Sequence, residues 1–205
     1  MNKWAILTLA AACISSEISA QSTETANKAK SAPRPAEIAK FFIDEPKKDS
    51  PYETGPLHIV YSDGTESVQT LPPYKASTEK EMVYNEAGFS GVQLAADRQT
   101  LGWTIDLDNA NAYPVALFVV VFRHHKVLHA FEPGLTVWDW MFLESGKQVA
   151  VVSGPLHGPG AGEYRLYDVQ TGKLMSKVFG DDKTEALKRD EPAWAKLLQD
   201  HLHKR

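Results

Sequence analysis

Cysteine is almost absent from this sequence, because its 205 residues include one, Cys13. If an N-terminal segment is removed after Ala20, the mature chain contains no cysteine. Such a chain forms no disulfide, so its fold depends on a hydrophobic core. Residues 21–205 are long enough for one core of ordinary size, which predicts a single domain.

Positive charge is also scarce, since 22 Lys and Arg are outnumbered by 26 Asp and Glu, for a formal net charge of −4. Nucleic-acid binding requires a clustered basic face, so we expect no nucleic-acid partner. The G-x-S-x-G pattern of a nucleophile elbow is missing. The glycine-rich stretch 154–162 is followed by neither Lys-Ser nor Lys-Thr, which argues against a phosphate-binding loop.

Residue types that bind metals occur without the spacing that a metal site needs. Asp106 and Asp108 form a D-x-D pair, but the following residues lack the glycine and glutamate of a calcium loop. His124, His125 and His129 have no cysteine or carboxylate within their segment to complete a ligand set. We therefore expect no metal and no cofactor.

The N-terminus has the pattern of a secretory signal peptide. A basic start, Met1-Asn2-Lys3, precedes the uncharged run Trp4–Ile14, and the small residue Ala20 is suited to cleavage. The run is too short for a membrane-spanning helix, which needs about 20 apolar residues. Residues 1–20 therefore predict export to the bacterial periplasm or beyond, with no transmembrane span after processing. Lipoprotein processing at Cys13 is the minor alternative, since alanines precede this cysteine but Leu is missing three places before it.

The rest of the chain divides into a linker and a domain. Residues 21–55 are rich in Ser, Thr, Ala, Lys and Pro, which predicts a flexible linker. An apolar island within it, residues 36–43, predicts a short helix that ends before Pro46. Residues 56–205 predict a single β-rich domain with a C-terminal helix.

Two segments show the β character of this domain most clearly. Leu57–Tyr61 and Ser67–Leu71 flank Asp63-Gly64, and glycine tolerates the positive φ of a tight hairpin turn. Pro114–Arg123 is a continuous apolar run, which is typical of a strand buried on both faces. We expect Trp103, Phe118, Val120, Trp140 and Val149 to be buried.

The C-terminal residues change to a helical period. Asp190 is the expected N-cap, with Pro192 in the first turn. Trp194, Leu197, Leu198 and His201 share one face of this helix at i, i+3, i+4 and i+7 spacing. That face predicts packing against the β domain.

An internal repeat with an offset of 47 positions is visible between residues 91 and 179. Asp97-Arg98-Gln99 aligns with Glu144-Ser145-Gly146, and Val119-Val120 aligns with Leu166-Tyr167. Each copy predicts a four-strand antiparallel meander, the first with strands at 91–96, 100–106, 114–123 and 127–131, the second at 137–143, 148–153, 164–169 and 173–179. The predicted fold is mainly β, with two such units, an N-terminal hairpin and a C-terminal helix.

The stretch Arg165–Leu174 resembles the outer strands of a β-propeller blade of the WD40 or periplasmic PD40 kind. A propeller closes with about 4–8 blades, and this chain has two units and a hairpin. The units therefore either act as blades, with partner chains supplying others, or pack as a sandwich. A wider resemblance, carried by Trp138-Asp139-Trp140, His157-Gly158 and Pro192-Ala193-Trp194, is to small exported bacterial proteins of unassigned function, and it implies compartment and fold but no chemistry.

The candidates for a binding site are His157, Glu163 and Trp138. His157 and Glu163 lie in a long glycine-rich loop, where an imidazole and a carboxylate can do acid–base work or simply shape the loop. Trp138 and Trp140 lie two apart, hence on one sheet face, where they form an aromatic platform or, as we favour, part of the core. Asp139 between them is expected to be solvated or paired.

These observations favour an exported, non-catalytic β-rich binding domain whose partner is another envelope protein or a second copy of itself. The alternative is a periplasmic hydrolase that uses His157 and Glu163. The strand Leu57–Tyr61 has little charge to protect its edge. We therefore hypothesise that it pairs with a partner chain or closes onto the last unit.

Overall fold

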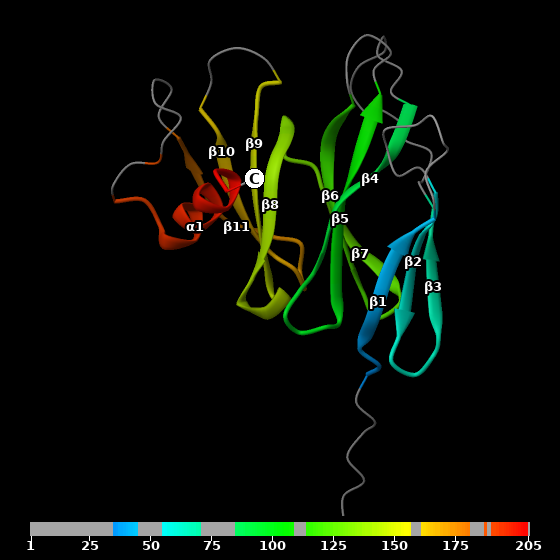
Figure 1. Ribbon diagram of the computed structural model, residues 1–205. Coiled ribbons are helices and arrows are strands. Elements are labelled where there is room, and N and C mark those ends of the chain that lie inside the picture. Colours follow the sequence, from blue (N-terminus) through cyan, green and yellow to red (C-terminus); the bar gives the residue numbers. More distant parts are fainter. Residues whose placement is uncertain are drawn as a thin grey trace, which may run out of the picture. The chain divides into compact units, whose positions relative to one another are not determined.

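The computed structural model describes residues 35–44, 55–70, 85–108, 114–156, 161–180, 187 and 190–204. Within residues 85–108, side chains are described from residue 88 onward. All of them belong to one compact unit, Arg34–Arg205. They form three antiparallel sheets followed by a C-terminal helix (Figure 1). The mainly β class predicted from the sequence is confirmed, as are the two four-strand meanders.

The N-terminal sheet has the order β1-β2-β3, with β1 at Ile38–Ile43, β2 at Leu57–Tyr61 and β3 at Glu66–Gln69. The predicted hairpin is present as β2 and β3, and Gly64 takes a positive φ of 84° in its turn. The helix predicted for residues 36–43 is wrong, because this segment is strand β1. Pairing with β2 satisfies its backbone and places its isoleucines and Phe41 against the core, an arrangement that favours β-branched and aromatic residues.

Strand β2 is the central strand of this sheet, which corrects the hypothesis about its edge. Strand β1 pairs with one side of β2 and β3 pairs with the other. Neither side of β2 is therefore left for a partner chain or for the last meander. The sequence placed β1 in the linker, and so one neighbour of β2 was missed.

Two meanders make the middle sheet and the C-terminal sheet. The middle sheet holds β4 (Asn85–Leu94), β5 (Thr100–Asp108), β6 (Val115–Arg123) and β7 (Lys126–Phe131) in chain order. The C-terminal sheet holds β8 (Thr136–Leu143), β9 (Gln148–Gly154), β10 (Glu163–Asp168) and β11 (Leu174–Phe179), with a short 3-10 turn at Glu144–Gly146 between β8 and β9. Strands β5, β6 and β7 begin at residues 100, 115 and 126, and β9, β10 and β11 begin at 148, 163 and 174, a constant offset of 48.

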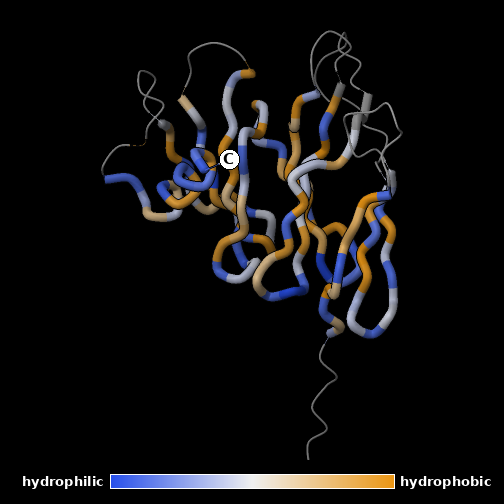
Figure 2. The backbone as a smooth tube through the Cα atoms, viewed as in Figure 1, coloured by the Kyte–Doolittle hydropathy of each residue, from blue (hydrophilic) through white to orange (hydrophobic). Residues whose placement is uncertain are grey.

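The sheets stack face to face through alternating side chains. In β6, Val120 and Phe122 pack with the N-terminal sheet, whereas Val119 and Val121 pack with the C-terminal sheet. The continuous apolar run is therefore buried on both faces, as predicted. Figure 2 shows apolar residues along the strands and polar residues gathered in the turns. Such stacking is common to sandwiches and to neighbouring propeller blades.

The expected core is largely confirmed. Trp103, Val120, Trp140 and Val149 are buried. Phe118 is partly buried and packs at the margin of the cluster between the N-terminal and middle sheets.

Helix α1 (Ala193–Leu202) covers the far face of the C-terminal sheet (Figure 1). Its N-cap is Pro192 without a side-chain hydrogen bond, so the prediction of Asp190 as N-cap is wrong. Its fully buried residues are Ala195 and Leu198, whereas Leu197 is exposed, because the face that meets the sheet is turned from the one predicted. In the described part of the chain, no helix combines the length and the apolar character needed to cross a membrane.

Candidate functional site

The two tryptophans of β8 lie on opposite faces of the C-terminal sheet. The pairing register with β9 shifts between Val137 and Asp139, so residue 138 is an extra residue in a β-bulge. Trp140 is 1% exposed and packs toward the middle sheet, whereas Trp138 packs on the helix side. The expectation that both rings lie on one sheet face is therefore wrong, and with it the interpretation of the pair as an aromatic platform.

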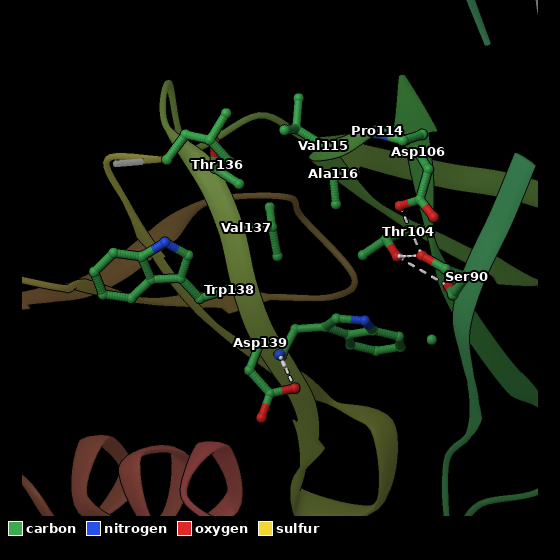
Figure 3. Close-up of a pocket in the computed structure, with 13 residues that line it drawn as sticks. Ser90, Thr104, Asp106, Pro114, Val115, Ala116, Thr136, Val137, Trp138 and Asp139 are labelled. Atoms are coloured by element: carbon green, nitrogen blue, oxygen red, sulfur yellow. Dashed lines mark hydrogen bonds between the residues drawn. The ribbon is translucent and has the colours of Figure 1, made fainter. Parts of the chain in front are cut away.

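Trp138 fills space left by two glycines. A Cβ built on Gly154 would lie 2.0 Å from Trp138 Cζ2, and one on Gly162 would lie 3.1 Å from Trp138 Cζ3. Figure 3 shows the Trp138 ring directed away from Ser90, Thr104 and Asp106. Trp138 also borders the cavity described below, so its role as a binding residue stays a prediction.

Asp139 is paired, which is one of the two outcomes expected from the sequence, solvated or paired. Its buried Oδ2 lies 2.6 Å from His201 Nδ1 of α1, and its Oδ1 accepts a hydrogen bond of 2.8 Å from the Trp140 backbone N–H. This contact ties the C-terminal helix to β8.

Glu163 is held by two cations on the face of the C-terminal sheet. Its Oε1 accepts hydrogen bonds from Arg165 Nε and, at 2.7 Å, from Lys177 Nζ. Burial raises the pKa of Glu163, but the hydrogen bonds from Lys177 and Arg165 outweigh burial and leave the pKa below its ordinary value. An ionised, doubly paired carboxylate is a poor proton donor or acceptor at neutral pH. His157 lies outside the described residues, so its pairing with Glu163 stays a prediction.

Strand β11 forms the outer edge of the C-terminal sheet, and we call Leu174–Phe179 the β11 edge. Three large apolar side chains are exposed on it: Leu174 at 49%, Met175 at 52% and Phe179 at 55%. Lys177 is bound to Glu163, and its Nζ lies 4.7 Å from the Phe179 ring centroid. This edge therefore carries exposed apolar side chains, and no described strand pairs with its outer side.

A cavity of about 310 Å³ lies between the middle and C-terminal sheets, and we call it the inter-sheet cavity. Its polar wall is made by Ser90 of β4 with Thr104 and Asp106 of β5. Figure 3 shows these three residues together, with Val137 of β8 on the opposite side. Pro114, Val115, Ala116 and Leu156 add apolar lining.

The polar wall is a connected hydrogen-bond network. Ser90 Oγ donates to Asp106 Oδ1 at 2.8 Å and lies 2.6 Å from Thr104 Oγ1, which itself donates to the Ser90 carbonyl at 3.0 Å. Burial raises the pKa of Asp106, and the hydrogen bond from Ser90 opposes that shift. The network fixes a carboxylate and two hydroxyls on one side of the cavity.

Trp140 brings an unpaired donor to the same cavity. Its Nε1 is buried and has no hydrogen-bond partner among the described residues. A Cβ built on Gly91 would lie 3.4 Å from this nitrogen and 3.5 Å from Thr104 Oγ1, so the missing side chain leaves both atoms open. A buried unsatisfied N–H costs about 1–3 kcal/mol.

Reasoning from the sequence missed this cavity. The sequence pattern relates Asp106 only to a calcium loop and Trp140 to the core or an aromatic platform, and it does not single out Ser90. No local spacing signals the site, because β4–β5 pairing assembles the polar wall and the stacking of the sheets brings Trp140 to it.

Comparison with known proteins adds no further assignment: no protein-family model matches the chain, and a search of curated proteins finds no significant match. The class of the protein accordingly rests on its architecture, a mainly β fold of three stacked antiparallel sheets with a C-terminal helix.

Proposed function

We propose that this chain is an exported, non-catalytic binding domain that works in the bacterial periplasm or outside the cell, and that its ligand is another protein. The observation that carries this proposal is the apolar β11 edge. A strand edge presents free N–H and C=O groups that can accept another strand. Leu174, Met175 and Phe179 add apolar surface at that edge.

The surroundings of the β11 edge define the partner segment. Glu163, Arg165 and Lys177 form a cluster with two positive charges and one negative charge. An added strand would pass Lys177 and the apolar side chains of Leu174 and Phe179. We therefore propose an extended partner segment with alternating apolar residues and an acidic residue opposite Lys177, since opposite charges across a strand pair are favourable.

The test compares two variants with equally exposed targets. The double variant Leu174→Glu with Phe179→Glu places negative charge on the β11 edge, and Leu197→Glu does the same on the exposed side of α1, where Leu197 is 53% exposed. Mature protein carrying a photo-reactive residue at position 175 or 197 is cross-linked in a bacterial envelope extract. We expect a protein that is captured from position 175 by the wild type and by Leu197→Glu, and lost in the double variant.

Sequencing the cross-linked peptide provides the second criterion. An extended segment with alternating apolar residues and an acidic residue supports the proposal. Capture that is equal from positions 175 and 197, or unchanged in the double variant, overturns it. Cross-links to the chain itself would replace the partner protein by a second copy.

The alternative proposal is a periplasmic hydrolase that uses His157 and Glu163. The ion pairs of Glu163 count against it, because they hold the carboxylate ionised and neutralised. We keep it as the weaker hypothesis.

A further inference from the structure

The inter-sheet cavity contains a donor for which the described part of the chain supplies no acceptor. Trp140 Nε1 is buried in a side chain that is 1% exposed, and no described residue accepts its hydrogen. Buried polar groups in folded proteins are nearly always satisfied, by protein, by water or by a ligand. The indole N–H therefore indicates an acceptor that enters the cavity from outside the chain.

The opposite wall supplies acceptors. Asp106 is a carboxylate, and Ser90 and Thr104 are hydroxyls that use their own hydrogens within the network. A group that enters between this wall and Trp140 therefore has to donate toward Asp106 and accept from Nε1. A hydroxyl group does both, since it has one donor and two acceptor lone pairs.

Charge argues against ionic ligands. An anion would meet the carboxylate of Asp106, and a cation would meet the positive end of the indole N–H. The rest of the lining mixes apolar side chains, such as Val137, Ala116 and Leu156, with the hydroxyl of Thr136 and with Asp139, whose carboxylate is already paired with His201. Such walls suit the C–H faces of a neutral molecule, and a volume of about 310 Å³ is at the low end for ligand sites, which limits the ligand to a small one.

From these contacts we infer that the inter-sheet cavity binds a small neutral polyhydroxyl compound, of the size of one sugar ring, with one hydroxyl placed between Asp106 and Trp140 Nε1. This site is separate from the β11 edge, and its ligand is independent of the protein partner proposed above.

The experiment observes the indole N–H of Trp140 directly. Mature protein labelled with nitrogen-15 gives one indole signal per tryptophan, and the signal of Trp140 is the one that disappears in Trp140→Phe. The probes are glucose, galactose, N-acetylglucosamine and glycerol, with choline and acetate as charged controls. We expect a saturable shift of the Trp140 signal with at least one neutral probe and none with choline or acetate.

Variants test the contacts that carry the inference. Asp106→Asn should weaken binding of the responding probe at least tenfold, because the strongest acceptor is lost. Asp200→Asn, on the exposed side of α1, is the matched control and should bind like the wild type. Trp140→Phe keeps an aromatic ring in the core but lacks the donor, and it should weaken binding by a similar factor, as measured by calorimetry.

Three outcomes overturn the inference. A Trp140 signal that responds to none of the neutral probes means that the acceptor is water alone. A saturable response to acetate or choline means that the ligand is ionic. Binding that Asp106→Asn leaves unchanged, in a protein whose other indole signals keep their positions, means that the probe sits elsewhere.

Discussion

At the scale of single residues, the environment of each tryptophan in β8 is set by one extra residue. The bulge at Trp138 turns its ring to the helix side, where Gly154 and Gly162 leave room for it. Trp140 then faces the middle sheet, and its ring approaches Gly102 so closely that a Cβ there would lie 2.7 Å from Trp140 Cη2. The two rings therefore contribute to two different clusters.

Trp140→Ala should lower the free energy of unfolding by about 3–5 kcal/mol, the range for removing a large side chain from a core. The side chain is 1% exposed and joins two sheets, so little relaxation can refill its space. Trp138→Ala is the matched comparison and should cost less, because Trp138 is only partly buried. Urea unfolding of both variants measures the difference. A loss below about 1 kcal/mol for Trp140→Ala would contradict the buried position.

At the scale of elements, helix α1 depends on a polar contact as well as on Ala195 and Leu198. His201 Nδ1 lies 2.6 Å from Asp139 Oδ2, and the Asp139 side chain is fully buried. A buried carboxylate needs its partners, because desolvation is costly when a hydrogen bond is missing. The contact therefore specifies where the end of the helix meets β8.

His201→Ala should lower the free energy of unfolding by about 1–3 kcal/mol, the cost of depriving a buried polar group of a partner. His203→Ala removes an exposed imidazole two residues away and should leave stability unchanged. Thermal and urea unfolding measure both variants. Equal effects of the two substitutions would show that the pair with Asp139 contributes nothing to docking of the helix.

The N-terminal sheet has its own polar contact on its outer face. His58 Nδ1 lies 2.5 Å from Glu66 Oε1, and His58 Nε2 lies 3.3 Å from Asp44 Oδ2. The hydrogen bond with Glu66 raises the pKa of His58 above its ordinary value of 6.5, burial opposes this, and Asp44 adds to the rise. The imidazole therefore links the β2–β3 pair to the end of β1.

This raised pKa predicts how the stability of the sheet depends on pH. The folded sheet binds the proton more tightly than the unfolded chain, so the contribution of His58 is fully present below the unfolded pKa of 6.5. It is lost as the pH rises through the higher pKa of the folded state. Amide hydrogen exchange in β2 and β3, followed across this range, should show protection that falls with rising pH. His58→Gln should remove that dependence, and a variant that keeps it would assign the effect to another group.

At the scale of the whole molecule, the described chain is a stack of three sheets and a helix, joined by three apolar clusters. Strands β6 and β9 each contribute alternate side chains to two of the clusters. In β9, Val149 and Val151 face the middle sheet while Ala150 and Val152 face the helix. The sheets are therefore coupled through shared strands, and the outer edge of the last sheet carries three exposed apolar residues, Leu174, Met175 and Phe179.

The export hypothesis makes a prediction about the whole chain. Protein recovered from the periplasm of an expressing bacterium should begin at Gln21, because the uncharged run Trp4–Ile14 and Ala20 match a cleavable signal peptide. Intact-mass measurement reads the N-terminus directly. A mass that corresponds to a chain beginning at Cys13 with added acyl chains would show lipoprotein processing instead. The mass of an uncleaved chain would contradict both forms of processing.

Local sequence determined most of the strands and turns of the two meanders, although β4 begins at Asn85 and not at the predicted residue 91. The turn at Gly64 and the apolar run in β6 depend on neighbouring residues alone, and both are found as predicted. Three strand pairs of the two meanders, β5 with β9, β6 with β10 and β7 with β11, begin 48 residues apart, where the sequence alignment has 47. Alternation within a strand carries this information because successive side chains face opposite sides.

Tertiary structure decided what depends on residues far apart in the chain. The island at residues 38–43 becomes strand β1 because β2 offers it a ladder of hydrogen bonds and a core to cover, which outweighs any local helical tendency. The bulge at Trp138 separates two side chains that ideal alternation would place together. The inter-sheet cavity exists because Ser90, Asp106 and Trp140 come from three strands in two sheets, and only the stacking of those sheets makes them neighbours.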